Sequence, residues 1–577
     1  MRGVAVVSLL NWKKSLQNFK KLFVVDSSTQ GKTFSLSSSR QPYQRKVTLT
    51  RKYNPKNKEK RDIPVATKDI QKAIASLFHA NKNPDFVNRV LKTSYGQISI
   101  FYYQSMIDAQ QVQDAVIEPL VSLNAEQEQL SWENLKDLLT YSHVTKEVTT
   151  LEDSAVQISA GRVFVHVEGF AIALAVKAGT RESRAVESPK TETVIRGAND
   201  SFVEEIRTNL YLLRMRLSIP EFIAEPIEQP HRSQERLYML YIEGVTSPKL
   251  VKEMRRRLQA INVDALHSIG NLEHYVQGRP LSVFSQGITT ERPDRTISHL
   301  LEGSVAVMMK GSPNALLMPV TLWSQLHSPE DYYFRWPIGT FARVIRLIAL
   351  IVAIFLPSLY IAVVNFHPEM IRTELMLSIA SARERVPFPT FLEILFLELA
   401  FEFIRESALR IPNMIGPTIG IVGAIIIGQA VVEAGIVSPI VIVILAITVL
   451  AGFSIPYYTL TYSVRILRLI FVFFASTFGF FGIVVGLLLL AHHLVSLKSL
   501  GVPFLSPVSP LRPGNQDVII RPLPYLQELR PTFMGVLNKQ KEALLQRPWD
   551  VNTPSEIHLL KSYTRSKKPA LRKKKKQ

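Results

Sequence analysis

Long runs of apolar residues dominate the second half of the chain. An α-helix needs roughly 20 such residues to cross the ~30 Å hydrocarbon core of a bilayer. The runs that reach or approach this length are Val344–Val364, Ile411–Val432, Val437–Ile455 and Ile466–Leu494. A fifth block, Phe388–Ile404, is shorter and contains glutamates. The pattern predicts a membrane domain over residues 342–497, built as a bundle of four to five transmembrane helices.

The number of spans determines on which sides of the membrane the two ends of the chain lie. Arg335, Arg343 and Arg346 flank the first span, and basic residues concentrate in cytoplasmic segments. We therefore expect the region before the bundle to be cytoplasmic. Four spans place both basic ends on that side, whereas five place them on opposite sides. With four spans, either the acidic block or one half of Ile411–Ile455 is re-entrant or interfacial.

In front of the bundle, the patterning alternates between strands and helices. Gln97–Tyr103 is typical of a strand, and a turn at Asp108 and a helix follow it. Leu237–Ile242 repeats this design, with a helix that opens at Ser247-Pro248. The same order of elements therefore occurs twice.

Two hairpins are repeated as well, with turns at Glu168-Gly169 and at Lys310-Gly311. A strand–helix unit and a hairpin that occur twice predict a two-lobed α/β domain over residues 67–325, not a solenoid. A cleft between two lobes is a natural ligand or partner site. The alternative is that the lobes are simply rigid neighbours.

Composition divides the rest of the chain. Residues 1–66 are Ser-rich and basic, which predicts a poorly ordered extension. Residues 326–341 form an aromatic junction, and Trp and Tyr are typical of the membrane interface. Residues 498–577 are expected to be a Pro-rich and then Lys-rich cytoplasmic tail. The expected fold class is α/β plus membrane α-helical, with a two-lobed cytoplasmic domain followed by the helical bundle.

Charge and cysteine content exclude several functions. The chain has 577 residues, no Cys and a formal net charge of +20. Disulfides, thiolate metal sites and thiol nucleophiles are thereby excluded. We interpret the basic ends as solvated cytoplasmic tails that contact anionic lipids. Nucleic-acid binding is not expected, because no aromatic platform accompanies the lysines.

No catalytic set is recognisable in the sequence. There is no Walker-type glycine loop, no His-Glu-x-x-His and no Gly-x-Ser-x-Gly elbow. His492 and His493 point apart on a helix and have no third ligand nearby. We therefore predict neither an enzyme, nor a cofactor, nor a metal site.

The informative polar residues lie inside the membrane block. Glu398, Glu402 and Glu406 follow i, i+4 spacing and form one stripe on a helix. Arg405 is expected to meet Glu402, and Arg410 to meet Glu406. Ionisable groups at membrane depth usually face a bundle interior or a water-filled path. The alternative is an interfacial helix whose acidic face meets water.

A glycine face in the next block allows close approach of another helix. Its members are Gly416, Gly420 and Gly423. Gln429 and Glu433 project from roughly the opposite side, which suits a pore or an oligomer seam, although they could also cap the span. We take Gln429, Glu433, Glu398 and Glu402 as a candidate ion pathway, and the three glycines as a candidate seam for helix packing or oligomerisation.

Several long motifs occur in one order between about residues 67 and 512. In the soluble part they are Val194-Ile-Arg-Gly, Phe202-Val-Glu-Glu-Ile-Arg-Thr-Asn, Thr289-Thr-Glu-Arg-Pro-Asp and Ser328-Pro-Glu-Asp-Tyr-Tyr. In the membrane block they include Arg383-Glu-Arg-Val-Pro-Phe-Pro, Gly416-Pro-Thr-Ile-Gly and Gly428-Gln-Ala-Val-Val-Glu. Through these motifs the chain resembles the A subunits of bacterial spore germinant receptors, the GerA family. Ala198 and Ser201 depart from the family pattern, which has Pro and Gly there.

The resemblance implies a multi-pass protein of the spore inner membrane with a cytoplasmic N-terminal domain. It implies two partners, a transporter-like B subunit that senses the nutrient and a lipoprotein C subunit. It further implies a homo-oligomeric ring that passes cations once the nutrient binds. The alternatives are a non-conducting scaffold that transmits the signal, and the paralogue that acts with the SpoVA dipicolinate-release channel. A secondary transporter would need inverted repeats across the membrane block, and we find none.

Overall fold

The computed structural model describes residues 61–93, 96–121, 132–140, 145–178, 187–228, 236–410, 426–510, 517–523, 527 and 529–541. Within them, the soluble part contains two five-stranded antiparallel sheets. We call each sheet and the helices on it a lobe.

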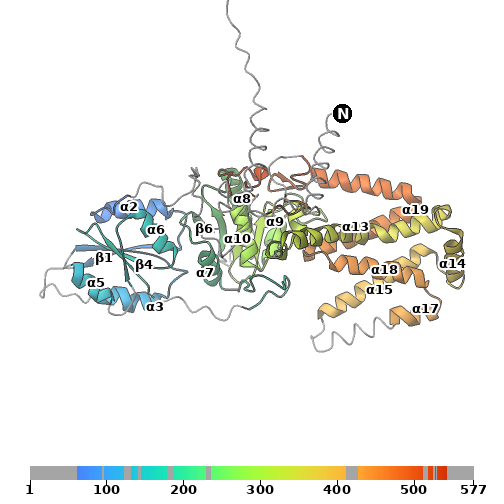
Figure 1. The fold of residues 1–577 in the computed structure, drawn as a ribbon, viewed down its shortest axis with the longest axis horizontal. Helices are drawn as coiled ribbons and strands as arrows, with labels where there is room; N and C mark the ends of the chain where they lie inside the picture. The colour runs from blue at the N-terminus through green and yellow to red at the C-terminus, as the bar shows by residue number, and fades with distance from the viewer. Residues whose placement is uncertain are drawn as a thin grey trace, which may run out of the picture. The chain divides into compact units, whose positions relative to one another are not determined.

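The first lobe has a sheet with strand order β1-β2-β4-β5-β3. Its strands are β1 (Phe86–Thr93), β2 (Gly96–Tyr103), β3 (Thr145–Val148), β4 (Val163–Val167) and β5 (Ala173–Val176). Its helices are α2 (Thr67–Leu77), α3 (Ala109–Val112), the π-helix η2 (Gln113–Ile117), α4 (Glu118–Val121), α5 (Trp132–Thr140) and α6 (Leu151–Ser159). Alternate side chains of β2 enter different cores, because Phe101 packs with α2 and α6 whereas Ile100 packs with α3 to α5. Helices therefore cover both faces of the sheet (Figure 1).

The second lobe repeats this architecture with strand order β6-β7-β9-β10-β8. Its strands are β6 (Phe222–Ile227), β7 (Leu237–Ile242), β8 (Ile288–Thr290), β9 (Val305–Met309) and β10 (Ala315–Met318). Its helices are α7 (Ile206–Arg216), α8 (Pro248–Gln259), α9 (Ile269–Val276) and α10 (Pro293–Leu301). The strands of the two lobes correspond one to one, and both predicted hairpins, β4–β5 and β9–β10, are present. The repeat predicted from the sequence is therefore a duplicated fold.

A buried arginine joins the two lobes. Arg214 of α7 is 1% exposed and donates from Nε to Asp85 Oδ2 of the first lobe at 2.7 Å. Its guanidinium also donates to Asn83 Oδ1 at 3.1 Å and lies 3.7 Å from the centre of the Tyr103 ring. Ser105 completes the site by donating to both oxygens of Asp85. An ion pair withdrawn from water in this way is costly to break, because the remaining charge has no compensation.

The part of the chain that follows the second lobe contains five longer described helices, which we call the bundle. They are α13 (Trp336–Phe366), α14 (Thr373–Arg383), α15 (Thr390–Arg410), α18 (Pro439–Phe453) and α19 (Tyr458–Ser496), with the short η3 (Pro368–Met370), η4 (Ile426–Ala430) and α17 (Val431–Glu433) between them. Only α13 and α19 among the described helices are long and apolar enough to be candidate spans, and α18 is a shorter apolar helix. The predicted four to five transmembrane helices are therefore not confirmed. Most of the predicted span Ile411–Val432 lies outside the described residues.

Helix α19 differs from the single predicted span Ile466–Leu494, because it reverses direction at Gly479. This residue has φ 59° and ψ −138°, a conformation that favours glycine. A Cβ on Gly486 would lie 2.8 Å from the ring of Phe471, fifteen positions earlier. In a straight helix these positions would be about 22 Å apart. The apolar run is therefore a hairpin of two helical arms, 458–478 and 480–496.

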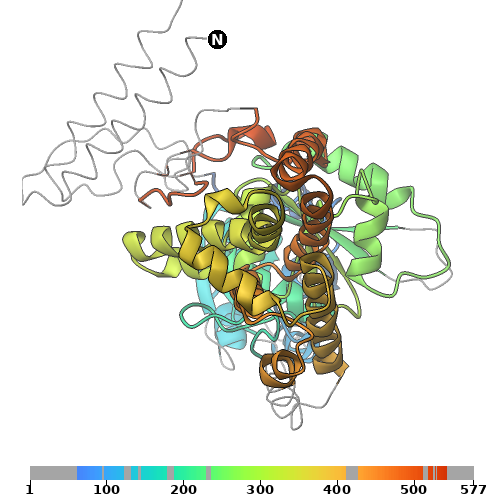
Figure 2. The same ribbon diagram turned by 90° about the vertical axis from the view of Figure 1, so that its right-hand side faces the viewer.

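The contacts of the helix ends divide them into ends that lie next to the second lobe and ends that lie far from it. Ser463 and His493, one on each arm of α19, meet the second lobe at Val283 and Ser282. Phe366, at the end of α13, instead packs against Gly479. The contacts Asn365–Thr390 and Glu393–Ser438 lie at the end of α13 that is remote from the lobe. Figure 2 shows the bundle from this remote end.

The core of the second lobe continues into the bundle. One cluster of buried hydrophobic residues includes Phe284 and Leu326 of the lobe together with Ala353 of α13 and Leu467 of α19. A continuous apolar core resists separation, because parting its two sides exposes both to water. The second lobe and the bundle therefore form one packed body.

Replacing Arg214 with Met should destabilise the contact between the lobes by about 3–5 kcal/mol, because Asp85 stays buried without its cation. Urea unfolding of the full chain in detergent, with hydrogen exchange read out at β2 and α7, measures this loss. Arg216→Met on the same helix is the matched control. Its ion pair with Asp200 is one-third exposed on the arginine side, so the expected loss is within about 1 kcal/mol. Equal losses in the two variants would contradict the role of Arg214.

The hairpin in α19 predicts which positions label from the same side of the membrane. The chain has no native Cys, so single cysteines report one site each. Thr459→Cys and His492→Cys, both exposed, should react with a membrane-impermeant maleimide from one side, and Thr477→Cys from the other. A straight α19 would instead be about 58 Å long and would place positions 459 and 492 on opposite sides. Labelling of those two positions from opposite sides would therefore contradict the hairpin.

Candidate functional site: charged residues of the bundle and its junction

The predicted acidic stripe on α15 faces arginines of α19. Glu398 Oε2 accepts from Arg468 Nη2 at 2.7 Å, and both side chains are buried. Glu402 accepts from Arg465 at 2.9 Å and from Arg405 at 3.0 Å. The predicted contact between Glu402 and Arg405 is confirmed. The partners on α19 were not predicted, although basic residues three positions apart in an apolar helix were a signal for them.

The remaining predicted pair is also confirmed, since Arg410 Nη2 donates to Glu406 Oε1 at 2.6 Å. Both of these side chains are exposed, so the pair adds little stability. The Glu398–Arg468 pair differs because it is buried between two helices. Removing one member of such a pair strands a charge. In this structure, the ion pair of Glu398 therefore holds α15 against α19.

Glu393, on the first turn of α15, does not face the arginines of α19. It accepts from the backbone N–H of Ser438 at 2.9 Å, and its other oxygen lies 3.7 Å from Arg383 Nε. Ser438 is the residue immediately before α18. Glu393 thus connects the starts of α15 and α18.

The other candidate residues have different surroundings. Gln429 in η4 and Glu433 at the end of α17 are exposed, and the structure brings neither into contact with Glu398 or Glu402. The glycines of the proposed seam lie outside the described residues: Gly416, Gly420 and Gly423. The four candidate residues of the ion pathway therefore fall into two groups, one paired with arginine and one exposed.

A second charged cluster, which the sequence did not predict, lies where the second lobe meets α13. Asp331 of α12 (Glu330–Tyr333) is 1% exposed. It accepts from Arg346 at 2.6 and 2.8 Å and from Arg343 Nε at 3.1 Å. Two of the three arginines interpreted as markers of membrane orientation, Arg343 and Arg346, are therefore partners of one buried carboxylate.

The C-terminal segment completes this cluster. Asp517 pairs with Arg343 and accepts from the hydroxyl of Tyr332 at 2.5 Å. Arg521 donates to the backbone oxygens of Asp331 and Phe334 at 2.6 and 2.9 Å. The short strands β11 (Lys498–Ser499) and β12 (Val502–Pro503) and the turn η6 (Thr532–Met534) lie in the same segment. The described parts of residues 498–541 therefore pack against the second lobe.

Burial and charge shift the pKa values in this cluster. Burial by itself raises the pKa of Asp331, but the hydrogen bonds and charges of Arg346 and Arg343 outweigh it and leave the pKa below its usual value. Burial likewise raises the pKa of Asp517, but the charge of Arg343 and the hydrogen bonds from Tyr332 and Arg343 outweigh it and leave the pKa below its usual value. Burial, aided by the charge of Arg343, lowers the pKa of His327 to about 4. His327 is therefore neutral at pH 7 and donates from Nε2 to the carbonyl oxygen of Val518 at 2.6 Å.

Comparison with known proteins places the chain in a family. The model of the family described as Bacillus/Clostridium GerA spore germination protein matches residues 72–533. The chain belongs to the GerA family. Its relatives include spore germination protein GerLA of Bacillus cereus, 36% identical over 77% of this chain and 90% of the relative. Spore germination protein A1 of Bacillus subtilis is 34% identical over 82% of this chain and 94% of the relative.

The chain is also similar to two further proteins. A protein of Bacillus subtilis named uncharacterized membrane protein YfkQ is 35% identical over 78% of this chain and 88% of its own length. Among solved structures, the chain is similar to the N-terminal domain of the A subunit of the Bacillus megaterium spore germinant receptor GerK3. That similarity has 22% identity and a TM-score of 0.36, and it covers 45% of this chain and 98% of that domain.

Three of the motifs that resemble the GerA family meet beside the Asp331 cluster. The backbone N–H of Ile195 donates to Glu330 at 2.5 Å, and Tyr333 donates to Asp294 at 2.8 Å. Gly197 has φ 147°, and a Cβ there would lie 2.7 Å from the Tyr333 ring, so glycine is required. The family motifs thus fix the loop 194–197 onto α10 and α12.

The two departures from the family pattern are accommodated by backbone contacts. The carbonyl oxygen of Ala198 accepts from Arg292 Nη2 at 2.9 Å, a bond that any residue at this position can provide. Ser201 donates from both its N–H and its hydroxyl to the carbonyl oxygen of Glu187. The loop therefore keeps its anchors.

The partly buried residues His299 and His327 predict that acid destabilises this region. Burial lowers the pKa of His299 to about 3, as it lowers that of His327 to about 4, against about 6.5 in an unfolded chain. Between these values the unfolded chain binds protons that the folded chain does not, so stability falls as pH falls. The expected slope is about 1.4 kcal/mol per pH unit for each histidine. The stabilisation from Asp331 and Asp517 is present above pH ~3.8 and is lost only below it.

Urea unfolding between pH 4.5 and 7 measures this slope through tryptophan fluorescence. His327→Gln can still donate to Val518 but cannot take up a proton, so it should reduce the slope by the contribution of one histidine. His274→Gln, at an exposed position on α9, is the control and should leave the slope unchanged. An unchanged slope in His327→Gln would show that this histidine is not buried in the neutral form.

Proposed function

We propose that this GerA-family protein is the A subunit of a spore germinant receptor and acts in germination without catalysing a reaction. The observation that carries the proposal is the match to proteins named spore germination proteins along most of their length. We place the protein in the spore inner membrane, with the two lobes of residues 67–325 in the cytoplasm. Its partners would be a transporter-like B subunit and a lipoprotein C subunit.

Within this proposal, several copies form a ring that passes cations after the nutrient binds to a partner. The nutrient-bound partner would favour a state in which the bundles of neighbouring copies separate, as in a population shift. Gly416, Gly420 and Gly423 would form the seam between copies. Gln429 and Glu433 would line the pathway, because acidic side chains that face water favour cations.

The ion pairs of α15 give Glu398 and Glu402 a specific part in this mechanism. In the described state their charges are balanced by Arg468, Arg465 and Arg405, so they attract cations weakly. They would contribute to the pathway only in a state in which α15 and α19 move apart. The Asp331 cluster would carry motion of the second lobe to α13, since the lobe and the helix share this carboxylate.

The pairing also supports the alternative, a scaffold that transmits the signal while a partner moves the ions. Two of the four candidate residues are neutralised by arginines of the same chain, as expected for purely structural ion pairs. A third role, that of the paralogue acting with the SpoVA dipicolinate-release channel, shares the same family resemblance. The oligomeric state and conductance of the purified protein discriminate the channel from the scaffold.

The charge assignment is tested by cation flux from proteoliposomes that contain the chain alone or with its B and C partners. Glu433→Gln and Glu402→Gln should each lower the preference for potassium over chloride by roughly fivefold, since a unit charge close to an ion in water contributes about 1 kcal/mol. Glu406→Gln, in an exposed pair on the same helix, is the matched control and should behave as wild type.

Unchanged conductance and selectivity in both test variants would refute the proposed ion pathway. A protein that is monomeric in detergent and passes no ions, alone or with its partners, would favour the scaffold. Neither result affects membership of the GerA family, which rests on the sequence comparison.

A further inference from the structure

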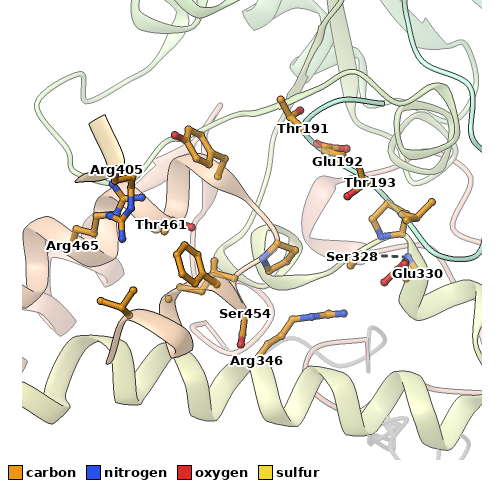
Figure 3. A pocket seen from close by; sticks show the side chains of 18 of the residues that line it. Thr191, Glu192, Thr193, Ser328, Glu330, Arg346, Arg405, Ser454, Thr461 and Arg465 are labelled. Atoms are coloured by element: carbon orange, nitrogen blue, oxygen red, sulfur yellow. Dashed lines mark hydrogen bonds between the residues drawn. The ribbon is translucent and has the colours of Figure 1, made fainter. Parts of the chain in front are cut away.

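A pocket of about 900 Å³ lies where the second lobe meets α15, α18 and α19 (Figure 3). Arg405 and Arg465 lie side by side at one end of it, and Glu192, Ser328 and Glu330 line the opposite end. None of the four residues assigned above to a cation pathway lines this pocket. One of them, Glu402, contacts the two arginines of the pocket.

The end formed by Arg405 and Arg465 carries excess positive charge. Both guanidinium groups share the single carboxylate of Glu402, one on each oxygen. Arg465 is 9% exposed, and its Nε has no hydrogen-bond partner in the part of the chain that the structure describes. A buried donor without a partner is costly, so this end of the pocket is suited to an anion.

The other two arginines of the pocket are already neutralised. Arg346 pairs with Asp331 at 2.6 Å, and Arg295 pairs with Glu192 at 3.0 Å. The unbalanced positive charge is therefore confined to the end of the pocket inside the bundle. Aromatic rings help to orient the two guanidinium groups of this end. The guanidinium of Arg465 lies 4.5 Å from the centre of the Tyr462 ring, and that of Arg405 lies 5.8 Å from the centre of the Phe453 ring.

The wall beside these arginines is apolar and comes from the bundle. Its members are Phe401, Ile404, Val449, Phe453 and Ile455. A small soluble anion has no use for such a wall, whereas the acyl chain of an amphiphile gains by burial against it. The combination of two guanidinium groups and an apolar wall matches an anionic headgroup attached to a hydrocarbon chain.

The depth of the site agrees with a lipid headgroup. Arg465 lies seven residues into α19, about 10 Å from its start at Tyr458. Arg405 lies five residues, about 8 Å, from the end of α15 at Arg410. Tyr458 and Tyr462 near this end are typical of the boundary between headgroups and hydrocarbon.

We propose that this pocket binds an anionic phospholipid. The phosphate lies between Arg405 and Arg465, where it supplies the missing partner of Arg465 Nε and competes with Glu402 for both guanidinium groups. The acyl chain lies against Phe401, Ile404 and Phe453. The inference requires only that the bundle lies in a membrane, and it does not depend on ion conduction.

Native mass spectrometry of the full chain, reconstituted with phosphatidylglycerol or phosphatidylcholine, tests the site. Wild type should retain phosphatidylglycerol in preference to phosphatidylcholine. The double variant Arg405→Gln/Arg465→Gln should bind phosphatidylglycerol about tenfold more weakly or worse, because two charge-assisted hydrogen bonds are lost. Arg410→Gln, an exposed arginine on the same helix and outside the pocket, is the matched control and should bind as wild type.

Glu402→Gln distinguishes a lipid site from a purely structural cluster, and it remains informative if the double variant misfolds. Removing the competing carboxylate should strengthen binding of phosphatidylglycerol, whereas a structural role alone predicts no gain. Inorganic phosphate at about 10-fold molar excess over lipid should not displace the bound phosphatidylglycerol.

Three results would overturn the proposal. One is equal retention of the two lipids by wild type, and another is unchanged binding in both the double variant and Glu402→Gln. The third is displacement by inorganic phosphate, which would assign the pocket to a soluble anion. A readout of ion flux is not involved, so these outcomes are independent of the test of the proposed channel.

Discussion

The attachment of the bundle to the second lobe depends on one buried carboxylate. Asp331 is 1% exposed and holds Arg343 and Arg346, which both lie in the first turns of α13. Two arginines at the base of an apolar helix would be costly to bury without an anion. Asp517 and Arg521 then anchor the C-terminal segment to the same cluster. Lobe, helix and C-terminal segment therefore share one electrostatic centre.

The two lobes have the same strand order but different surroundings. The first lobe is joined to the second through the Arg214 site, whose buried hydrogen bonds need close alignment. The second lobe shares its core with the bundle, because α7 and α10 cover a face that continues into α13 and α19. A duplicated fold has thus diverged in what it contacts. The first copy contacts the second through Arg214, while the second also packs against the helical bundle.

Sequence reasoning predicted the elements whose pattern is local. Strand β7 and the hairpins β4–β5 and β9–β10 follow from alternating or continuous apolar runs that end in Gly turns. Strand β8, with three residues, is too short to give a pattern, and β1 is largely exposed. The bend at Gly479 was missed because both arms of α19 are apolar, so that hydropathy shows one run. The Asp331 cluster was missed because Arg343 and Arg346 were read as flanks of a span, and because Asp517 is distant in sequence and only the fold brings it to Arg343.

The charged residues of α15 show why an acidic stripe does not by itself identify an ion path. The spacing of Glu398 and Glu402 predicts that they lie on one face of α15. It does not predict that this face contacts the arginines of α19. A carboxylate paired with a guanidinium presents nearly no net charge to a passing cation. Parting the buried Glu398–Arg468 pair costs several kcal/mol, whereas the side chain of Glu402 is already about half exposed. A state that exposes Glu398 must therefore recover this energy elsewhere, through a partner or through a new ligand for Arg468. An anion that binds Arg405 and Arg465 would release Glu402 without leaving a bare cation. The pairing of α15 with α19 and the occupancy of the pocket would then be coupled, and lipid composition would shift the balance between the two states.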